Sequence, residues 1–388
     1  MSAIRIGIAG MGAAGLAFVP ALRKHPQFDW VAFAEPVDAV REQYARQHGE
    51  TAYASLPELL AHPGLDAVYI ATPTELHTAQ VLQAAQARKH ILVEKPMAVS
   101  IAAGRAMVDA AEAAAVVLVV GHSHSHDLPI RRMRDLIASG ELGAVGMANT
   151  WCHTDWMNRP RRAAELEPRL GGGVTFRQGA HQFDILRLLC GGLARSIRAR
   201  TFDWNPQRGG TGAHSAWIEF ENGAAATAVY NGYGALSTMD LCGDISEWGF
   251  RQAPGSRPSH AAAGVGSPQD ELLAKQQRAG SAIPAQAPHQ PFFGLTVVSC
   301  ERGDIRQSPQ GLLVYTTGRM REIVLPTDRS PRELVLDEFH AAITGRQRAV
   351  HDGRWGLGTL ELCVAALESS RTGAPVRLSA QVPVNPDL

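Results

Sequence analysis

Three glycines, Gly10, Gly12 and Gly15, place the strongest constraint on what this chain can fold into. They form a G-x-G-x-x-G motif that follows the apolar run Ile4–Ala9 and opens the helical pattern Ala13–Lys24. Glycines at this spacing permit a tight turn, the approach of backbone to a pyrophosphate, and close packing of helix on strand. The free N–H groups at the helix start favour an anion. The motif predicts a dinucleotide-binding turn formed by Gly10, Met11, Gly12, Ala13, Ala14 and Gly15.

An acidic residue lies at the distance that such a site requires. Glu35 ends the second strand-like run, Trp30–Ala34, and follows Gly15 by 20 residues. A carboxylate at this place accepts hydrogen bonds from the adenosine ribose and repels a 2′-phosphate. Neither Pro36 nor Val37 adds a cation, so we expect NAD rather than NADP. The alternative, a glycine turn in an unrelated α/β protein, is disfavoured by this full context.

The first third of the chain alternates β-prone runs with helical patterns. Further strands are expected at Ala67–Ala71, Ile91–Val93 and Val116–Val120, with helices at Val37–His48 and Leu76–Ala87. Ser55 and Glu58 have the spacing of a capping box. Alternation of this kind predicts a parallel sheet with helical crossovers. We therefore expect an α/β fold with an N-terminal Rossmann domain over residues 1–125.

Beyond residue 125 the pattern predicts an α+β domain over residues 126–388, built on a large, open, mostly antiparallel sheet. The expected strands are Ser215–Phe220, Ala224–Tyr230, Leu295–Ser299 and Gly311–Tyr315, and the expected helices are Pro129–Ser139, Gln182–Leu189, Glu333–Ile343 and Trp355–Ser370. Residues 253–290 are rich in Ala, Gly, Pro, Ser and Gln. We expect them to leave the sheet as a long irregular excursion, with at most a short helix at 269–277.

Composition narrows the classes of partner. The 388 residues include 37 Lys+Arg and 37 Asp+Glu, so the chain lacks the basic field that holds nucleic acid or an anionic membrane. Five cysteines without a CxxC pair suit free thiols in a reducing compartment. The longest apolar run, Ala110–Val120, contains Glu112 and is too short to span a membrane. We expect a cytoplasmic protein that binds a small molecule.

Polar residues follow two of the predicted strands, at Ala71-Thr72-Pro73 and at Glu94-Lys95-Pro96. In a doubly wound sheet the carboxyl ends of the strands line the ligand crevice. Lys95 is one of only four lysines beside 33 arginines. A lysine here indicates a need for a compact ammonium whose pKa can fall on burial, which arginine does not provide. A surface lysine is the alternative, and the flanking Glu and Pro disfavour it.

These motifs, with Gly171–Gly173 and the run from Gly179 to Asp184, resemble the glucose-fructose oxidoreductase / inositol dehydrogenase (Gfo/Idh/MocA) family from residue 1 to about 375. The resemblance implies a bound nicotinamide nucleotide and an open C-terminal sheet that forms a homodimer or homotetramer. It implies a cis Lys95–Pro96 bond, a Lys95 that hydrogen-bonds the reacting hydroxyl, and His181 as its acid/base partner. The cofactor site would be completed by Ala71, Thr72, Pro73, His77, Glu94 and Lys95.

One position departs from the pattern of that family. Many members carry an Asp four residues before this histidine, where the chain has Arg177. A guanidinium would bind an anion in place of a neutral polyol. Arg159, Arg161 and Arg162 lie close by in sequence. The alternative is that these arginines form salt bridges at a surface or interface. For Arg161 and Arg162 this alternative has about the same weight as anion binding.

This region, with His122–Asp127 and Val350–Gly356, resembles the subgroup described as phthalate 4,5-cis-dihydrodiol dehydrogenases. The subgroup implies a dianionic cyclohexadiene diol whose oxidation to a catechol gains aromatic stabilisation and so favours NAD reduction. The expected substrate residues are His122, His124, Arg159, Arg177 and His181. A sugar, inositol or sugar-acid dehydrogenase is the nearest alternative. A non-catalytic NAD-sensing regulator is another, although it would be expected to lose Lys95 or His181.

A metal site is a further alternative for the histidines that follow Val116–Val120. On an extended strand His122, His124 and His126 would point the same way and could bind zinc or iron, with Asp127 or His153 completing the set. The segment leaves a strand at the crevice, so we expect one or two of these histidines to line the substrate pocket instead, without a metal.

Overall fold

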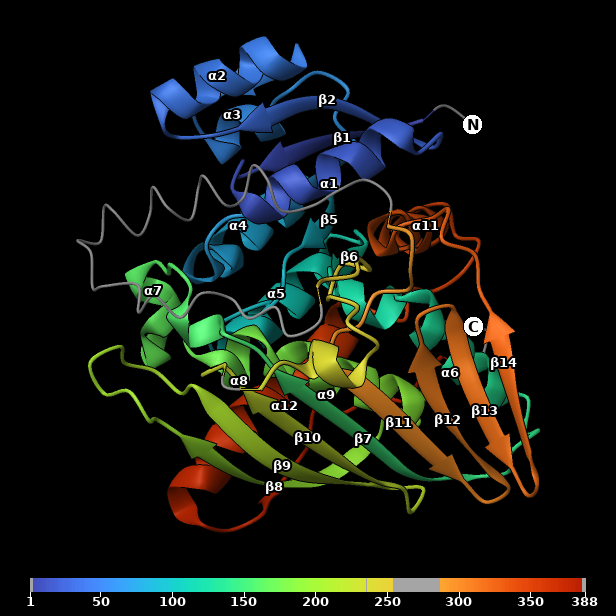
Figure 1. Cartoon of the computed structure of the whole chain (residues 1–388). Coiled ribbons are helices and arrows are strands. Elements are labelled where there is room, and N and C mark those ends of the chain that lie inside the picture. The colour runs from blue at the N-terminus through green and yellow to red at the C-terminus, as the bar shows by residue number, and fades with distance from the viewer. Residues whose placement is uncertain (1–2, 235, 254–286, 386–388) are drawn as a thin grey trace.

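The computed structural model describes residues 3–234, 236–253 and 287–385, and it contains two sheets with helices between and around them (Figure 1). A six-stranded sheet is formed by the N-terminal third, and a nine-stranded sheet is formed by the rest of the chain. The expected excursion 253–290, with its short helix at 269–277, falls largely outside the described residues.

The first sheet is entirely parallel, in the order β3-β2-β1-β4-β5-β6. This is the order of a dinucleotide-binding Rossmann domain. The elements are β1 (Ile4–Ala9), α1 (Ala13–Lys24), β2 (Phe28–Ala34), α2 (Asp38–His48), β3 (Thr51–Tyr53), α3 (Leu56–Leu60), β4 (Ala67–Ile70), α4 (Thr74–Gln86), β5 (His90–Val93), α5 (Ile101–Ala113) and β6 (Leu118–Val120). The expected capping box of Ser55 and Glu58 is confirmed at the start of α3.

The central strands of this sheet are apolar on both faces. All four residues of β4 are buried, as are three of the four residues of β5. Helices on both sides of a parallel sheet remove both faces from water, which requires such continuous apolar runs. The prediction of a Rossmann fold is therefore confirmed.

The second sheet is antiparallel except where β7 and β10 run parallel. Its order is β14-β13-β12-β11-β7-β10-β9-β8-β15. Its strands are β7 (Val145–His153), β8 (Ala194–Phe202), β9 (Ala213–Phe220), β10 (Ala225–Asn231), β11 (Leu295–Cys300), β12 (Gly303–Ser308), β13 (Gly311–Thr316), β14 (Arg319–Val324) and β15 (Val376–Arg377). The helices are η1 (Ser123–His126), α6 (Leu128–Ala138), η2 (Trp156–Asn158), α7 (Ala163–Leu166), η3 (Pro168–Leu170), α8 (Val174–Arg177), α9 (Gly179–Leu189), η4 (Thr238–Leu241), α11 (Pro331–Ile343) and α12 (Gly353–Thr372). The expected large antiparallel sheet is confirmed.

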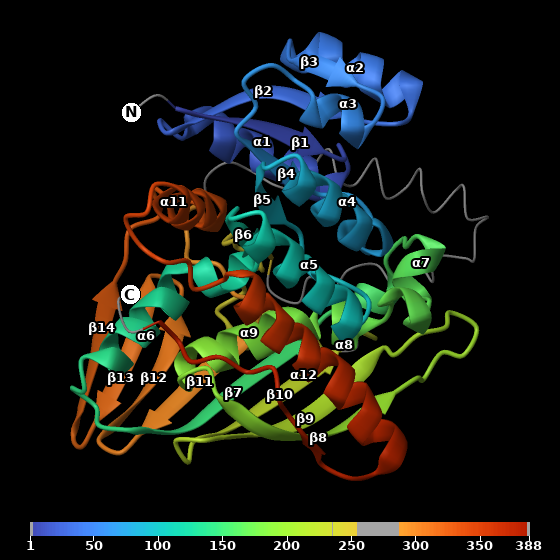
Figure 2. The same cartoon turned by 180° about the vertical axis from the view of Figure 1, so that it is seen from behind.

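Two long strands, β7 and β8, were not predicted. In β7 the exposed face carries Met147 and Trp151, so apolar side chains occur on both faces and the polar–apolar alternation is weak. In β8 the alternation is clear, because Ile197 and Ala199 are buried between exposed arginines. That pattern was sufficient to identify β8 from sequence. The buried side of the sheet faces α6, α9 and α12, as Figure 2 shows.

The C-terminal helices return to the first domain. α11 contacts α1, and its Phe339 stacks on Phe28 of β2 with 6.1 Å between ring centroids. α12 contacts α5 and β6. Just before α12, the carbonyl of His351 accepts a 2.8 Å hydrogen bond from the backbone N–H of Val120. This joins the C-terminal segment to the edge of the first sheet. His351 is thereby placed beside η1, at the junction of the two halves.

Two further expectations concern the whole chain. All five cysteines are free, and four of them are buried. Within the described residues, every helix is too short or too polar to span a bilayer.

Candidate active site

The glycine turn between β1 and α1 has the geometry of a dinucleotide site. Gly10 has a φ of +95°, and a side chain there would come within 3.0 Å of the Ala71 backbone. At Gly15 an added Cβ would lie 2.1 Å from the Gly10 carbonyl oxygen, so helix and turn are in direct contact. A Cβ at Gly12 would meet nothing within 4 Å, and no side chain caps α1 there. The helix start is thus open to a phosphate group, and the residues present fit a dinucleotide.

Glu35 lies against this turn. Its Oε2 accepts a 3.2 Å hydrogen bond from the Met11 backbone N–H, and its Oε1 accepts one of 3.1 Å from that of Val37. Arg41 is the nearest cation in sequence, but its guanidinium donates to the Glu35 carbonyl and to Asp38. A carboxylate therefore lies at the place where we expect the adenosine ribose of the cofactor to bind.

Two loops at strand ends form the other wall of the cofactor cleft. His77 is 1% exposed, and its ring lies between the carbonyl oxygens of Thr72 and Pro96, at 3.0 and 3.1 Å. The His77 ring therefore links the loop at Thr72 to the loop at Pro96. Glu94 accepts a 2.6 Å hydrogen bond from the Tyr69 hydroxyl and one from the Lys95 N–H. The expected cis Lys95–Pro96 bond is confirmed.

Lys95 is a partly buried lysine with a single hydrogen-bond acceptor among the described residues. Its Nζ donates to the Arg177 carbonyl oxygen at 3.0 Å. Burial lowers the pKa of Lys95 to about 8, although Glu94 and Glu247 favour the ammonium. A group with this pKa exchanges a proton near neutral pH, as a general base must.

His181 is on the first turn of α9 and is 4% exposed. Burial, followed by the charges of Lys95 and His124, holds its pKa well below the usual range for histidine. The ring is therefore neutral at neutral pH, and its Nδ1 is buried without a hydrogen-bond partner among the described residues. This low pKa favours the neutral ring of His181, whereas the pKa of Lys95 lies closer to neutral pH.

The histidines that follow β6 do not form an extended strand. Residues Ser123–His126 form the 3₁₀ helix η1, so His122, His124 and His126 point in different directions, and the hypothetical metal set on one strand face is wrong. The ring of His124 packs edge-on against His181, with 4.6 Å between centroids. His122 lies within 6.4 Å of the same ring, and burial lowers the pKa of His122 to about 4.

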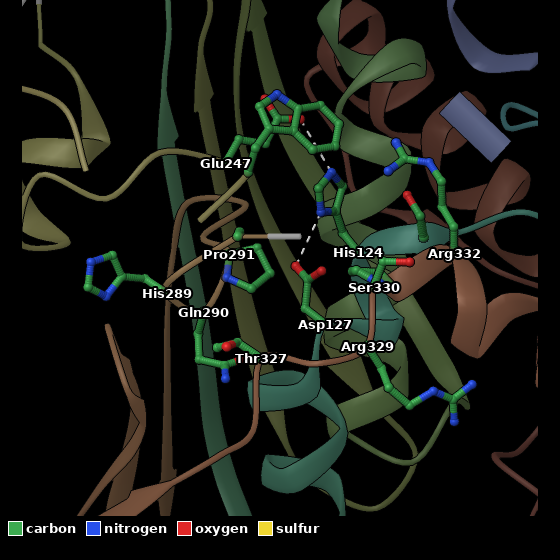
Figure 3. A pocket seen from close by; sticks show the side chains of 14 residues that line it. His124, Asp127, Glu247, His289, Gln290, Pro291, Thr327, Arg329, Ser330 and Arg332 are labelled. Atoms are coloured by element: carbon green, nitrogen blue, oxygen red, sulfur yellow. Dashed lines mark hydrogen bonds and ion pairs between the residues drawn. The ribbon is translucent and has the colours of Figure 1, made fainter. Parts of the chain in front are cut away.

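His124 carries a charge in this site. Its Nδ1 is 3.2 Å from Asp127 and its Nε2 is 3.3 Å from Glu247, as the dashed lines in Figure 3 show. Burial lowers the pKa of His124, but the two carboxylates outweigh it and raise the pKa to about 9. His124 is therefore an imidazolium next to the neutral His181.

The arginines expected to bind an anion form hydrogen bonds or ion pairs with other groups of the protein. The guanidinium of Arg177 donates to the Thr74 hydroxyl at 2.8 Å and to the Leu170 carbonyl at 3.4 Å, and the residue is 9% exposed. Arg159 pairs with Asp155 at 2.6 Å. Arg161 and Arg162 both pair with Glu165, at 3.7 and 3.8 Å. Salt bridging, the alternative weighed from the sequence, describes the contacts of Arg159, Arg161 and Arg162.

Two charged residues of the site were missed from the sequence. Glu247 follows β10 in an irregular segment, and Arg332 is on the first turn of α11; both line a cavity with His124 and Asp127 (Figure 3). The Arg332 guanidinium lies over the Trp248 ring at 5.2 Å, and within the described residues no hydrogen bond or ion pair engages it. No local pattern distinguishes either residue, since they meet only through packing of distant segments.

Comparisons with known proteins agree with this geometry. Residues 4–122 match a profile described as the oxidoreductase family with an NAD-binding Rossmann fold, and residues 130–240 match one described as the GFO/IDH/MocA C-terminal domain. The chain belongs to the Gfo/Idh/MocA family of oxidoreductases. Its cofactor is NAD.

Individual relatives extend over most of the chain. It is 34% identical over 382 residues to the 1-carboxy-3-chloro-3,4-dihydroxycyclohexa-1,5-diene dehydrogenase of Comamonas testosteroni, covering 95% of both chains. It is 28% identical over 229 residues to the NAD-dependent scyllo-inositol 2-dehydrogenase of Bacillus subtilis, covering 57% of this chain and 65% of the other. A crystal structure from Bordetella bronchiseptica RB50 matches with a TM-score of 0.88 at 36% identity, covering 97% and 100% of the two chains.

The position of Glu35 predicts how cofactor choice can be changed. Replacing Glu35→Ser removes the carboxylate that we expect to accept hydrogen bonds from the ribose, and hydrogen bonds to charged groups contribute about 1.5–3 kcal/mol. We expect the ratio of kcat/KM with NAD to that with NADP to fall by about 10- to 100-fold. Glu42→Ser, an exposed change in α2, is the control. Equal ratios in the wild type and both variants would contradict the assignment.

Proposed function

We propose that the protein catalyses the NAD-dependent oxidation of a carboxylated cyclic cis-dihydrodiol, with phthalate 4,5-cis-dihydrodiol as the leading candidate. Support comes first from the Comamonas testosteroni relative, whose name gives a carboxylated cyclohexadiene diol and whose similarity extends over 95% of both chains. Such a substrate combines two hydroxyl groups with an anionic carboxylate. Its site therefore needs a base for one hydroxyl and a cation for the carboxylate.

The observation that carries the proposal is the free guanidinium of Arg332. It lines the same cavity as His124, and its charge is one of those that lower the pKa of His181. Arginine binds carboxylates through two parallel N–H donors. A substrate carboxylate held by Arg332 would leave the ring of the diol near Lys95 and His181. This assigns the anion contact to Arg332 in place of the engaged Arg177.

The chemistry follows from the two central groups. NAD, when bound, supplies the acceptor for the hydride that leaves the carbinol carbon. The neutral amine of Lys95 accepts the hydroxyl proton, and its hydrogen bond to the Arg177 carbonyl fixes the direction of Nζ. The neutral ring of His181 hydrogen-bonds the same hydroxyl group and orients it. Loss of both hydrogens from the diol gives a ketone that becomes an aromatic catechol, which drives the reaction forward.

A neutral sugar or inositol is the second candidate. The scyllo-inositol 2-dehydrogenase of Bacillus subtilis is among the relatives of this chain, and Glu247 and Asp127 offer acceptors for hydroxyl groups in the cavity. A non-catalytic regulator is disfavoured, because Lys95 and His181 are both present and lie in one site.

The test is NADH formation, followed by absorbance, with a panel of substrates. The panel contains the phthalate diol, an uncharged aromatic cis-dihydrodiol, myo-inositol and common sugars. We expect turnover confined to the carboxylated diol. In Arg332→Gln the KM for that diol should rise about 10- to 100-fold, because the charged hydrogen bonds are lost, with little change for any neutral diol that reacts.

A matched control comes from the same cavity. Arg329 also lines it, but its guanidinium is paired with Asp337 at 2.6 Å. Arg329→Gln should leave the KM within about twofold of the wild type. Turnover of polyols alone would contradict the proposal of an anionic substrate. Binding of NAD without turnover of any substrate in the panel would favour a non-catalytic regulator.

The pKa of Lys95 predicts the pH dependence of the oxidation. Below pH 8 the amine is protonated and cannot accept a proton, so kcat/KM should fall about tenfold per unit as the pH drops below that value. Lys95→Arg keeps the positive charge but cannot lose it. We expect its rate to fall about 10²- to 10⁴-fold, with NAD still bound.

The control for this change is Lys89→Arg. Lys89 lies outside the site and donates to the Leu65 carbonyl, so its variant should keep the wild-type profile. If Lys95→Arg retained the wild-type rate and the same inflection near pH 8, Lys95 would not be the base.

We also propose that the outer face of the nine-stranded sheet binds a second copy of the chain. Trp151 and Trp217 are 38% and 47% exposed there, although both occur in the middle of the sheet. Exposed aromatic residues in a contiguous patch mark an interface. The double variant Trp151→Glu/Trp217→Glu should reduce the molar mass measured by light scattering after gel filtration. Trp204→Glu, on an exposed loop, is the control, and an unchanged mass in the double variant would contradict the interface.

A further inference from the structure

A second cluster of ionisable side chains lies behind the active site, where three separate elements meet. It consists of His126 from η1, Glu338 from α11, and His351 from the segment before α12. The two histidines are 2% and 0% exposed. One ligand atom from each residue lies within 4.8 Å of the other two. The proposed oxidation uses none of these groups.

The hydrogen bonds of His126 show which of its nitrogens is a donor. Nδ1 lies 3.2 Å from the carbonyl oxygen of His122, which can only accept, so Nδ1 carries the hydrogen. In the neutral ring Nε2 then presents a lone pair. A carboxylate oxygen of Glu338 lies 3.0 Å from that nitrogen. Two acceptors at this distance repel each other unless a cation lies between them.

His351 shows the same arrangement from the other side. The Ser125 hydroxyl donates to the His122 carbonyl at 2.8 Å, so its oxygen accepts from His351 Nε2 at 2.9 Å. Nε2, which also lies 3.4 Å from Asp184, therefore carries a hydrogen. In a neutral ring, Nδ1 has the lone pair, and it faces the Glu338 oxygens at 3.1 and 3.2 Å. Both imidazoles are thus oriented by acceptors behind them and present lone pairs toward one carboxylate.

This is the arrangement by which proteins orient metal ligands. A histidine that binds a metal donates its other N–H to a carbonyl, carboxylate or other acceptor, which fixes the tautomer. Two histidines and one glutamate are a recognised set for zinc. With zinc bonds of about 2.0–2.1 Å, neighbouring ligand atoms are about 3.3 Å apart. The separations of 3.0–3.2 Å between the Glu338 oxygens and the two ring nitrogens lie close to that value.

Two added protons would bring the same charge as a divalent ion, but would leave it on two separate rings. Both rings would have to be imidazolium for each to donate to Glu338, and Arg131 is also 3.7 Å from this carboxylate. Two carboxylates, Glu338 and the Asp184 that lies 3.4 Å from His351, would then face three cations. A divalent ion carries the charge of the two added protons at a single point and accepts the lone pairs directly.

We propose that His126 Nε2, His351 Nδ1 and the Glu338 carboxylate bind one divalent transition-metal ion, with Zn²⁺ as the best match. The role of the ion is structural: it joins α11 and the start of α12 to η1. Because His124 is also on η1, the ion helps to hold this active-site residue in position. This inference does not depend on the substrate proposed above, and its test does not use activity.

The first test uses the wild-type chain with NAD bound. Protein from zinc-supplemented medium should contain about one zinc per chain by elemental analysis. After removal of the metal with a chelator, the melting temperature should fall, and it should recover in proportion to the logarithm of added free zinc. Reloading with Co²⁺ should give the visible absorption bands of a four-coordinate site. The proposal would be overturned if the protein contained no metal and its melting temperature changed neither with chelator nor with added zinc.

Variants separate the cluster from its surroundings. Glu338→Gln and His126→Ala should each lower the zinc content at least tenfold and abolish the melting response to zinc. His340→Gln is the matched control, since it is on the same helix two residues from Glu338 and outside the cluster. If both cluster variants kept the zinc content of the wild type, the metal would bind elsewhere and the proposed site would be wrong. The same conclusion would follow if the control lost as much zinc as the cluster variants. The wild-type titration decides the question even where a variant fails to fold.

Discussion

The buried carboxylate of Asp184 is the interaction on which the arrangement of this protein depends. It is on α9 and is fully buried, and it accepts a 2.6 Å hydrogen bond from the Trp355 indole of α12. Burial raises the pKa of Asp184, but electrostatic interactions with the neighbouring His122 and His351, the latter 3.4 Å away, outweigh it and hold the pKa below the usual range. An ionised group without water must be satisfied by the protein. Asp184 therefore fixes α9 against α12, and with it the position of His181 one turn earlier.

In the active site beside this core, charged and neutral ionisable groups lie next to one another. His124 is charged because two carboxylates contact it, whereas His181, in contact with its ring, is neutral because cations surround a buried imidazole. Lys95 lies between these extremes, with a pKa of about 8. Neutral and charged groups only a few ångströms apart are what a proton transfer requires. The arrangement depends on exclusion of water, since the same charges in solvent would shift the pKa values far less.

Much of the fold and part of the site could be predicted from the sequence. The turn at Gly10, the carboxylate at Glu35 and the loop at Lys95 are local features, because each depends on residues adjacent along one strand end. The expected anion site could not be obtained in this way. Arg177 had the right spacing from His181, but its guanidinium turns toward Thr74, while Arg332 comes from a helix more than 150 residues later in the chain. Proximity across such a separation follows from packing rather than from local pattern.

The sequence by itself determined the Rossmann domain, the NAD preference and the presence of a lysine and a histidine suited to an oxidoreductase. These follow from local backbone geometry and from residue types that repeat wherever the same turn occurs. Only the tertiary structure decided that His124 and His126 lie on a 3₁₀ helix that begins just after His122, that His181 is neutral, and that Glu247 and Arg332 enter the cavity. Those properties depend on burial and on charges brought together from distant segments. A pKa or an ion pair is set by the surroundings of a side chain in space, and neither is encoded in its immediate neighbours along the chain.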